Sequence, residues 1–228
     1  VLQEFIDECK KENIKIYAWI NPYRIRTDND IKTISTKNPA YKYLGTDYIY
    51  INEGIYYNPS KQEVEDLIVS GVEEIVNNYD VDGVLFDDYF YPSDEIDYLD
   101  YTEYIKENDY IEPNIYRLNI VNKMIRRVYS VCKEKNILFG VSPDGNINNN
   151  YSYIYADIYK WLDSDLYIDF IMPQIYYGFF NEKMPFYNVV NEWNNAIKNK
   201  DITLIVALAI YKSGNIDTVA IYGKIMEE

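Results

Sequence analysis

The most restrictive feature of this 228-residue sequence is that it contains no histidine. Catalysis by Ser-His-Asp or Cys-His groups is therefore excluded, as are the histidine-bearing zinc sites of deacetylases and proteases. Any chemistry has to rest on Asp, Glu, Tyr, Asn, Gln, Arg or Lys. This absence narrows the possible reaction types more than most of the residues that are present.

Cysteine and long apolar runs are also scarce. Cys9 and Cys132 each lie within a helical pattern, which predicts free buried thiols and no disulfide framework. No apolar run approaches the roughly 18 residues that a transmembrane helix requires, so none is expected in this chain. No signal peptide is visible, and the sequence begins inside a helical pattern without an N-cap.

Positive charge is in short supply. The sequence has 22 Lys and Arg residues against 37 Asp and Glu residues, which gives a net charge of −15. An acidic surface repels phosphate backbones and anionic membranes, so nucleic acid and lipid surfaces are poor partners. Neutral or weakly charged substrates remain open.

Five short apolar segments alternate with helical patterns along the chain. The predicted strands are residues 14–20, 81–87, 137–141, 168–172 and 203–209, and the predicted helices are about 2–12, 62–78, 114–135, 153–162 and 187–198. A small hairpin is expected around 48–57, a capping box at 60–63 and an acidic loop at 93–112. The length fits one α/β domain, so residues 1–228 are predicted to form a single domain.

Each predicted strand ends in polar or aromatic residues, which favours a TIM barrel because its active site gathers side chains from many strand ends. A doubly wound sheet is the alternative, but no Gly-rich phosphate loop follows any strand. A closed barrel needs eight strands and only five are predicted. We therefore expect a fragment of a (β/α)8 barrel.

Residues 82–92, DGVLFDDYFYP, combine a buried strand with two carboxylates and three aromatic rings. Adjacent residues on an extended strand point to opposite sides, so we predict that Asp87 faces the barrel axis as the acid and Asp88 orients a neighbour. The alternative is that both carboxylates only anchor a loop. Glycosidases use two carboxyl groups, about 5–5.5 Å apart for retention and about 6.5–9.5 Å apart for inversion. Asp144 is the second candidate here, although Asp144-Gly145 is also a turn signal and the second acid could lie on strands outside this chain.

Other strand ends carry residues suited to binding sugars. Gln174 and Tyr176 alternate, so both can face one side and bind hydroxyl or N-acetyl groups, although Tyr176 could instead be core. Arg24 could bind a carboxylate such as the lactyl group of muramic acid, or pair with a loop Asp. Trp19 is expected in the barrel core. The remaining predicted binding residues at strand ends are Asn21, Tyr23, Tyr89, Tyr211 and Lys212, the last of which could equally form a plain salt bridge.

Four motifs follow one another in order: AWINPYR at 18–24, YDVDG at 79–83 running into FDDYFYP at 86–92, FGVSP at 139–143 and IMPQIY at 171–176. Together they resemble the family-10-like bacterial glycoside hydrolases over nearly the whole chain. Arg117 and Asn122 fit the family's helix before the fifth strand and are predicted to bind substrate on that basis. The resemblance implies a (β/α)8 barrel of which strands one, two and eight are missing, and an exported or lipid-anchored parent protein in the extracellular space or cell envelope. It also implies action on peptidoglycan glycan strands, which at least one member cleaves once the peptides have been removed.

A weaker likeness links residues 82–89 to the D-G-x-D-x-D-x-E strand of chitinase-type barrels. Leu85 and Tyr89 stand where a second acid and the catalytic Glu would be, so the chitinase mechanism does not transfer directly. The sequence thus predicts a glycoside hydrolase that acts on a bacterial N-acetylated glycan, with no cofactor and no metal. Two alternatives remain: a non-catalytic carbohydrate-binding barrel, and a metal-assisted enzyme that uses Asp87, Asp88 and Asp144 around Mg²⁺ or Ca²⁺.

Overall fold

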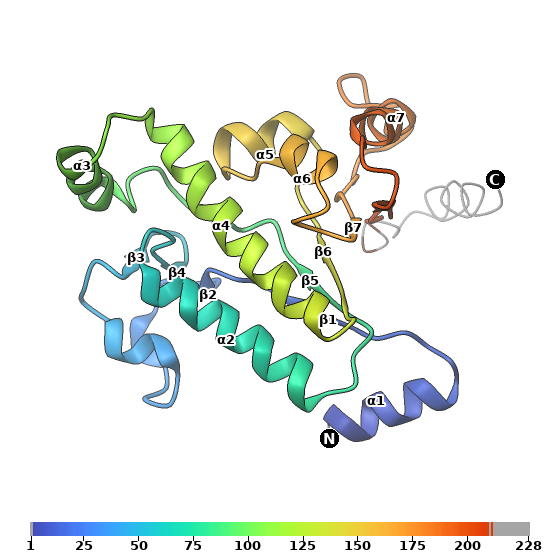
Figure 1. The fold of residues 1–228 in the computed structure, drawn as a ribbon, viewed down its shortest axis with the longest axis horizontal. Helices are drawn as coiled ribbons and strands as arrows, with labels where there is room; N and C mark the ends of the chain where they lie inside the picture. Colours follow the sequence, from blue (N-terminus) through green and yellow to red (C-terminus); the bar gives the residue numbers. More distant parts are fainter. Residues whose placement is uncertain (1, 210, 212–228) are drawn as a thin grey trace.

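A computed structural model describes residues 2–209 and 211, and its centre is a parallel sheet (Figure 1). The strands lie in the order β1-β5-β6-β7-β8, so neighbours in the sheet follow one another along the chain. Their bounds are β1 Tyr17–Ile20, β5 Gly83–Phe86, β6 Leu138–Val141, β7 Phe170–Ile171 and β8 Thr203–Leu204. All five predicted strands are present, and each pairs in parallel with the next. Single bridges from Gln174 to Asp144 and Ala207 extend the pairing past the ends of the short strands.

Helices connect the strands, as the alternating pattern predicts. They are α1 Leu2–Lys11, α2 Gln62–Asn78, α4 Pro113–Glu134, α5 Ile147–Tyr153, α6 Ile158–Asp163 and α7 Phe186–Ala196. In Figure 1, α2 and α4 run side by side across one face of β1, β5 and β6. Within the described residues, no helix is long and apolar enough to cross a membrane.

The main core lies between these helices and the outer face of the sheet. Val84 and Phe86 of β5 point into it, and the Phe86 ring packs edge-on against Phe139 of β6 with centroids 5.1 Å apart. The apolar stripe of α4 faces them, including Val121 and Ile125, which are fully buried. Burying an aliphatic side chain of this size contributes roughly 1.5–3 kcal/mol. The helical spacing on α4 thereby fixes which face of the sheet the helices cover.

The inner face of the sheet is crowded by aromatic rings over glycines. A Cβ atom at Gly83 would lie 2.2 Å from the Tyr17 ring, and one at Gly140 would lie 2.3 Å from the Phe170 ring. The two rings meet edge-on with centroids 5.5 Å apart. Glycine at both positions therefore makes room for rings on the face that also carries Leu85 and Asp87.

The long segment after β1 forms a second, antiparallel sheet in the order β2-β4-β3. Strands β3 Ile49–Ile51 and β4 Ile55–Tyr57 are the predicted hairpin, whereas β2 Arg24–Arg26 and the short 3₁₀ helices η1 Ile31–Thr33 and η2 Pro39–Tyr43 were not predicted. Two local predictions were wrong. The acidic stretch 93–112 contains a helix, α3 Tyr98–Glu107, and α2 is preceded by Lys61 with no side-chain cap, because the Ser60 hydroxyl donates to Asn58 instead.

Candidate functional site

The carboxylate of Asp87 lies at the carboxyl end of β5, where three neighbouring elements meet. The Trp19 indole Nε1 donates to it over 3.2 Å, Gln174 Nε2 over 3.3 Å and Asn21 Nδ2 over 3.5 Å. Trp19 and Asn21 come from the end of β1, and Gln174 follows β7. Asp87 therefore faces the inner side of the sheet, as the strand alternation predicts.

Asp88 does not point away from Asp87. Its backbone N–H donates to Asp87 Oδ1 over 2.8 Å, and the two carboxyl groups also share a hydrogen bond. The expectation that the two side chains would diverge was wrong, because the extended pairing with β1 reaches Asp87 and the alternation does not continue to Asp88. The result is an acid pair, Asp87 and Asp88, in one partly buried cluster.

The environment pushes the pKa values of the acid pair in opposite directions. Burial, together with the charges of Asp87 and Asp144, raises the pKa of Asp88 to about 7. Burial acts on Asp87 in the same sense, but hydrogen bonds from Asp88 and Trp19 and the charge of Arg24 outweigh it, so the pKa of Asp87 is lowered. Near neutral pH the pair thus holds one carboxylate and one readily exchanged proton.

The strand end after β7 completes this side of the site. Gln174 Nε2 also donates to the backbone oxygen of Ser142, over 3.0 Å, which fixes the amide between β6 and β5. The pKa of Tyr176 is raised by burial and by the nearby Tyr211 and both carboxyl groups of the acid pair. The Tyr176 ring meets the Tyr211 ring edge-on, with centroids 6.0 Å apart. Tyr211 is 75% exposed. Lys212 lies outside the described residues.

Arg24 and Tyr89 form a stacked pair beside the acid pair. The Arg24 guanidinium carbon lies 3.8 Å from the centre of the Tyr89 ring, and the Arg24 backbone N–H donates to Asn21 Oδ1 over 3.0 Å. Asn21 and Arg24 also line a pocket of about 410 Å³, together with Ile25, Arg26 and Thr27. Of the two sequence-based alternatives for Arg24, pairing with a loop Asp is not found among the described residues.

The structure assigns three of the predicted binding residues to the core. Tyr23 is fully buried. Arg117 is 7% exposed and forms a buried ion pair with Asp97, at 2.9 Å. The Asn122 amide oxygen accepts from the buried Trp161 Nε1 over 2.6 Å, and its nitrogen donates to Asp157 over 3.2 Å. Arg117 and Asn122 hold elements together, so their contacts support a structural role, and a role in substrate binding stays a prediction for all three residues.

Asp144 belongs to the turn that begins α5. Its Oδ1 accepts from the Asn146 backbone N–H over 2.6 Å, and its Oδ2 accepts from the Asn149 side chain over 3.4 Å. The turn signal in Asp144-Gly145 is therefore confirmed. Asp144 still acts on the site, because its charge contributes to the raised pKa of Asp88.

Sequence reasoning missed two residues near the acid pair. Trp19 was expected in the core, yet it is 53% exposed and donates to Asp87. Its position two residues before Asn21, on the same side of the strand, was the available signal. The second residue is Ser142. It follows Val141, the partner of Phe86 in the sheet, and therefore lies beside Asp87. Its hydroxyl is buried and has no hydrogen-bond partner among the described residues.

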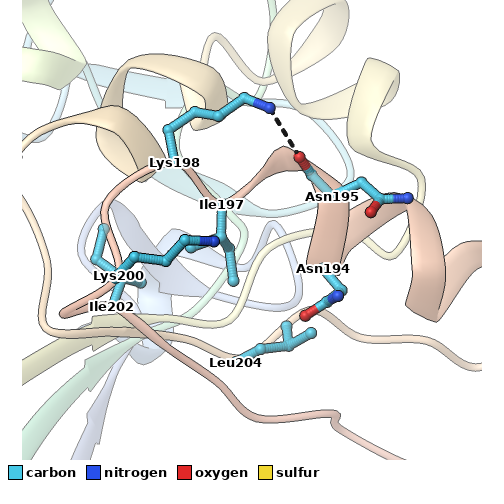
Figure 2. A pocket seen from close by; sticks show the side chains of 7 residues that line it. All are labelled: Asn194, Asn195, Ile197, Lys198, Lys200, Ile202 and Leu204. Atoms are coloured by element: carbon cyan, nitrogen blue, oxygen red, sulfur yellow. Dashed lines mark hydrogen bonds between the residues drawn. The ribbon is translucent and has the colours of Figure 1, made fainter.

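A separate pocket lies where the end of α7 leads into β8 (Figure 2). It has a volume of about 420 Å³ and is lined by the end of α7 and the segment that leads into β8: Asn194, Asn195, Ile197, Lys198, Lys200, Ile202 and Leu204. Because these residues precede or begin β8, this pocket is at the amino end of the strands, away from Asp87. In the described part of the chain, no group of three or more acidic or Cys side chains is placed to hold a metal ion, so the metal-assisted alternative gains no support.

Comparison with known proteins agrees with this geometry. A family model described as "Glycosyl hydrolase-like 10" matches residues 1–220. The "Glycosyl hydrolase YngK" of Bacillus subtilis (strain 168) is 32% identical over 233 residues, which cover 92% of this chain and 45% of the relative. The "Glycosyl hydrolase DigH" of Escherichia coli (strain K12) is 31% identical over 239 residues, which cover 93% and 54%, respectively. The chain thus spans about half the length of these relatives.

Among solved structures, the chain is similar to the Ostrinia furnacalis Group IV chitinase in complex with allosamidin. The TM-score is 0.50 at 10% identity, and the match covers 89% of this chain and 49% of that one. At this identity the likeness informs on the fold alone. Together with the parallel sheet and its helices, it confirms the expectation of a partial (β/α)8 barrel.

Proposed function

This chain belongs to the glycosyl hydrolase-like 10 family, and we propose that its acid pair cleaves glycosidic bonds. The observation that carries the proposal is the placement of two adjacent carboxyl groups at a strand end, where Trp19 and Gln174 donate to Asp87. Their pKa values are shifted in opposite directions: that of Asp88 is raised to about 7, and that of Asp87 is lowered. Two carboxyl groups whose environments separate their pKa values supply the acid and the carboxylate that glycoside hydrolysis needs.

We propose catalytic roles for Asp87 and Asp88 that are opposite to those the sequence suggested. Asp88 retains a proton near neutral pH, so it is the group that protonates the glycosidic oxygen as the bond to the anomeric carbon breaks. Asp87 stays ionised and can only accept hydrogen bonds or stabilise positive charge. We therefore assign the acid role to Asp88 and the carboxylate role to Asp87.

The short separation between the Asp87 and Asp88 carboxyl groups limits which hydrolytic mechanism they can support. Carboxyl groups that share a hydrogen bond are closer than the roughly 5 Å or more that separates the two acids on either side of a sugar ring. Both groups thus act on one side of the substrate. We propose that Asp87 accepts a hydrogen bond from the N–H of a 2-acetamido group, whose carbonyl oxygen then attacks the anomeric carbon. Water then attacks the anomeric carbon, the ring formed with the acetamido group opens, and Asp88 accepts the proton that this water loses.

The surrounding polar groups suit this task. Gln174 and Asn21 hold the Asp87 carboxylate from two sides, and the Tyr176 phenol lies near both carboxyl groups. An amide and a phenol can bind sugar hydroxyl and N-acetyl groups. The names of the two relatives support the reaction class, and the resemblance of the strand motifs supports a cell-wall glycan as the substrate and the cell envelope as the location of the protein.

The test measures the reducing ends released from an N-acetylated glycan by the full-length protein. Asp88→Asn and Asp87→Asn should each lower turnover by about 10²–10⁴-fold, the usual contribution of an acid–base group. Asp165→Asn is the matched control, because this carboxylate is exposed in the loop after α6. Undiminished turnover in both acid-pair variants would place the reaction elsewhere. Binding of the glycan with no release of reducing ends by the original protein would favour a non-catalytic binding module.

A further inference from the structure

A basic pocket lies on the outer side of the helix layer, between α4 and the segment that runs from α6 to β7. It has a volume of about 360 Å³, and four of the side chains that line it are cations: Lys123, Arg126, Arg127 and Lys160. The acid pair is not part of it, because α4 covers the outer face of the sheet (Figure 1) and Asp87 faces the inner one. In a chain of net charge −15, this gathering of positive charge is a local exception.

Two of the four cations are held by acids of α2. Glu65 contacts Lys123 at 2.9 Å and Arg127 at 2.6 Å, and Asp66 contacts Arg127 at 2.7 Å. Lys123 and Arg127 therefore join α4 to α2, and most of their charge is already balanced.

Arg126 and Lys160 keep their charge for a ligand. Both side chains are exposed, and no carboxylate among the described residues forms an ion pair with either. Asp157 brings one negative charge to the edge of the basic pocket, since it accepts from the lining residue Asn122 over 3.2 Å. With the two acids of α2, three carboxylates stand against four cations, so the pocket retains a net positive charge.

A buried tyrosine adds a hydrogen-bond donor to the basic pocket. Tyr167 lines the pocket, is only 7% exposed and has its ring packed into the main core. Its hydroxyl has no hydrogen-bond partner among the described residues. The hydroxyl of a buried tyrosine usually finds a partner, so a phenol left unpaired at the wall of a pocket is available to a ligand.

These three free donors come from three different elements and suit a phosphate group. Arg126 comes from α4, Lys160 from α6, and Tyr167 from the segment before β7. A phosphate group carries nearly two negative charges at neutral pH and has three strong acceptor oxygens, so it can pair with two cations and accept from a hydroxyl at once. The volume lies at the lower end of the range for small-molecule sites. An extended nucleic acid remains a poor partner, because the acidic charge of the whole chain acts along its length.

We propose that the basic pocket binds a phosphate group, with Arg126 and Lys160 pairing with its charge and the Tyr167 hydroxyl donating to one of its oxygens. Inorganic phosphate and the phosphate ester of a small polar molecule present the same oxygens. The site is separate from the acid pair, so the inference does not depend on the proposed function.

The test is calorimetric titration of the full-length protein with inorganic phosphate, glucose 6-phosphate and glucose. Both phosphate probes should bind and glucose should not. Arg126→Gln and Lys160→Gln should each weaken phosphate binding by about tenfold or more, the usual effect of losing a hydrogen bond to a charged group. Tyr167→Phe removes only the hydroxyl and should weaken binding by about threefold to tenfold.

Two lysine variants are matched controls, because each removes one exposed positive charge elsewhere. Lys106→Gln lies on α3, and Lys200→Gln lies in the pocket of Figure 2; both should leave phosphate binding unchanged. A loss in Lys106→Gln equal to that in Lys160→Gln would reduce the effect to general attraction, and an equal loss in Lys200→Gln would move the site to the other pocket. Either result, an unchanged affinity in Tyr167→Phe, or no binding of either phosphate probe would overturn the inference.

The two phosphate probes also identify the source of the group. Equal affinities would identify free phosphate as a sufficient ligand, whereas tighter binding of glucose 6-phosphate would identify an ester. Release of reducing ends from glycan by Arg126→Gln should equal that of the original protein, so this inference and the proposed function are tested independently.

Discussion

Two carboxyl sites that lie ten residues apart in the chain make opposite use of burial. Asp97 is fully buried and is surrounded by donors: Arg117 contacts both its oxygens, at 2.9 Å and 3.2 Å, and the Tyr91 hydroxyl donates over 2.9 Å. Asp87 and Asp88 are half-buried and are paired with each other. The first acid has a cation as its partner, whereas the second has another acid, which leaves one proton to be exchanged.

The Asp97 site has a structural role, whereas the acid pair is suited to catalysis. The Arg117 guanidinium also donates to the Tyr155 hydroxyl over 2.9 Å, so the ion pair ties the loop after the acid pair to α4 and to the segment before α6. A buried acid with a full set of donors holds the loop, and the acid pair on the neighbouring strand end is left to react.

The largest effect should come from breaking the buried ion pair. Arg117→Met leaves Asp97 without its cation in the core, which should lower the free energy of unfolding by about 3–5 kcal/mol. Chemical denaturation of the full-length protein measures this. The same change should leave the KM of whatever protein remains folded within a few-fold of the original value, and a large rise in KM at unchanged stability would return Arg117 to substrate binding.

A smaller loss is expected at Asn122. Asn122→Ala removes the acceptor of the buried Trp161 indole N–H, which should cost about 1–3 kcal/mol because that donor is left unsatisfied. The midpoint of denaturation reports it. Asn119→Ala is a suitable control, because Asn119 lies one turn away on α4 and is exposed; an equal loss in both variants would contradict the assignment.

Replacing Asp88 should change stability in the opposite direction as the pH rises: the variant should gain stability relative to the original protein. The pKa of Asp88 is raised from about 3.9 in the unfolded chain to about 7 in the folded protein, so its contribution is fully present below about pH 4 and is lost as the pH rises through 7. Asp88→Asn carries no such dependence. The Tm of the variant relative to the original protein should therefore rise by a few degrees between pH 5 and pH 8, as scanning calorimetry at both values can show. A constant difference would mean that the pKa of Asp88 is not raised.

The sequence was sufficient for the sheet because each strand is a short apolar run followed by polar residues, and helical spacing on segments such as 114–135 is unambiguous. It also placed Asn21, Asp87 and Gln174 at one rim, since the carboxyl ends of parallel strands share an edge. The sequence could not predict the directions of the Asp87 and Asp88 side chains relative to each other, because these depend on where β5 ends. Nor could it tell that Arg117 faces Asp97: a contact between residues 20 apart, through the fold of an acidic loop, leaves no periodic signal.

Trp19 and Tyr23 illustrate the same limit. Both are aromatic and both lie at the end of the first strand, yet Trp19 is 53% exposed at the acid pair and Tyr23 is fully buried. Strand alternation places Trp19 with Asn21 on the inner face. Tyr23 comes after the strand, where the turn into β2 decides its direction, and that turn is set by tertiary packing.

The most direct test of the central claim is the hydrolysis of an aryl N-acetylglucosaminide, whose phenolate leaves without protonation, by the full-length protein and by each acid-pair variant across the pH range. With an unactivated glycan, kcat/KM of the original protein should fall about tenfold per pH unit above 7, as Asp88 loses its proton. The account predicts that Asp88→Asn cleaves the aryl glycoside at a near-normal rate without this fall, while Asp87→Asn cleaves neither substrate. The reverse pattern, with Asp87→Asn active on the aryl glycoside and Asp88→Asn inactive, would contradict it.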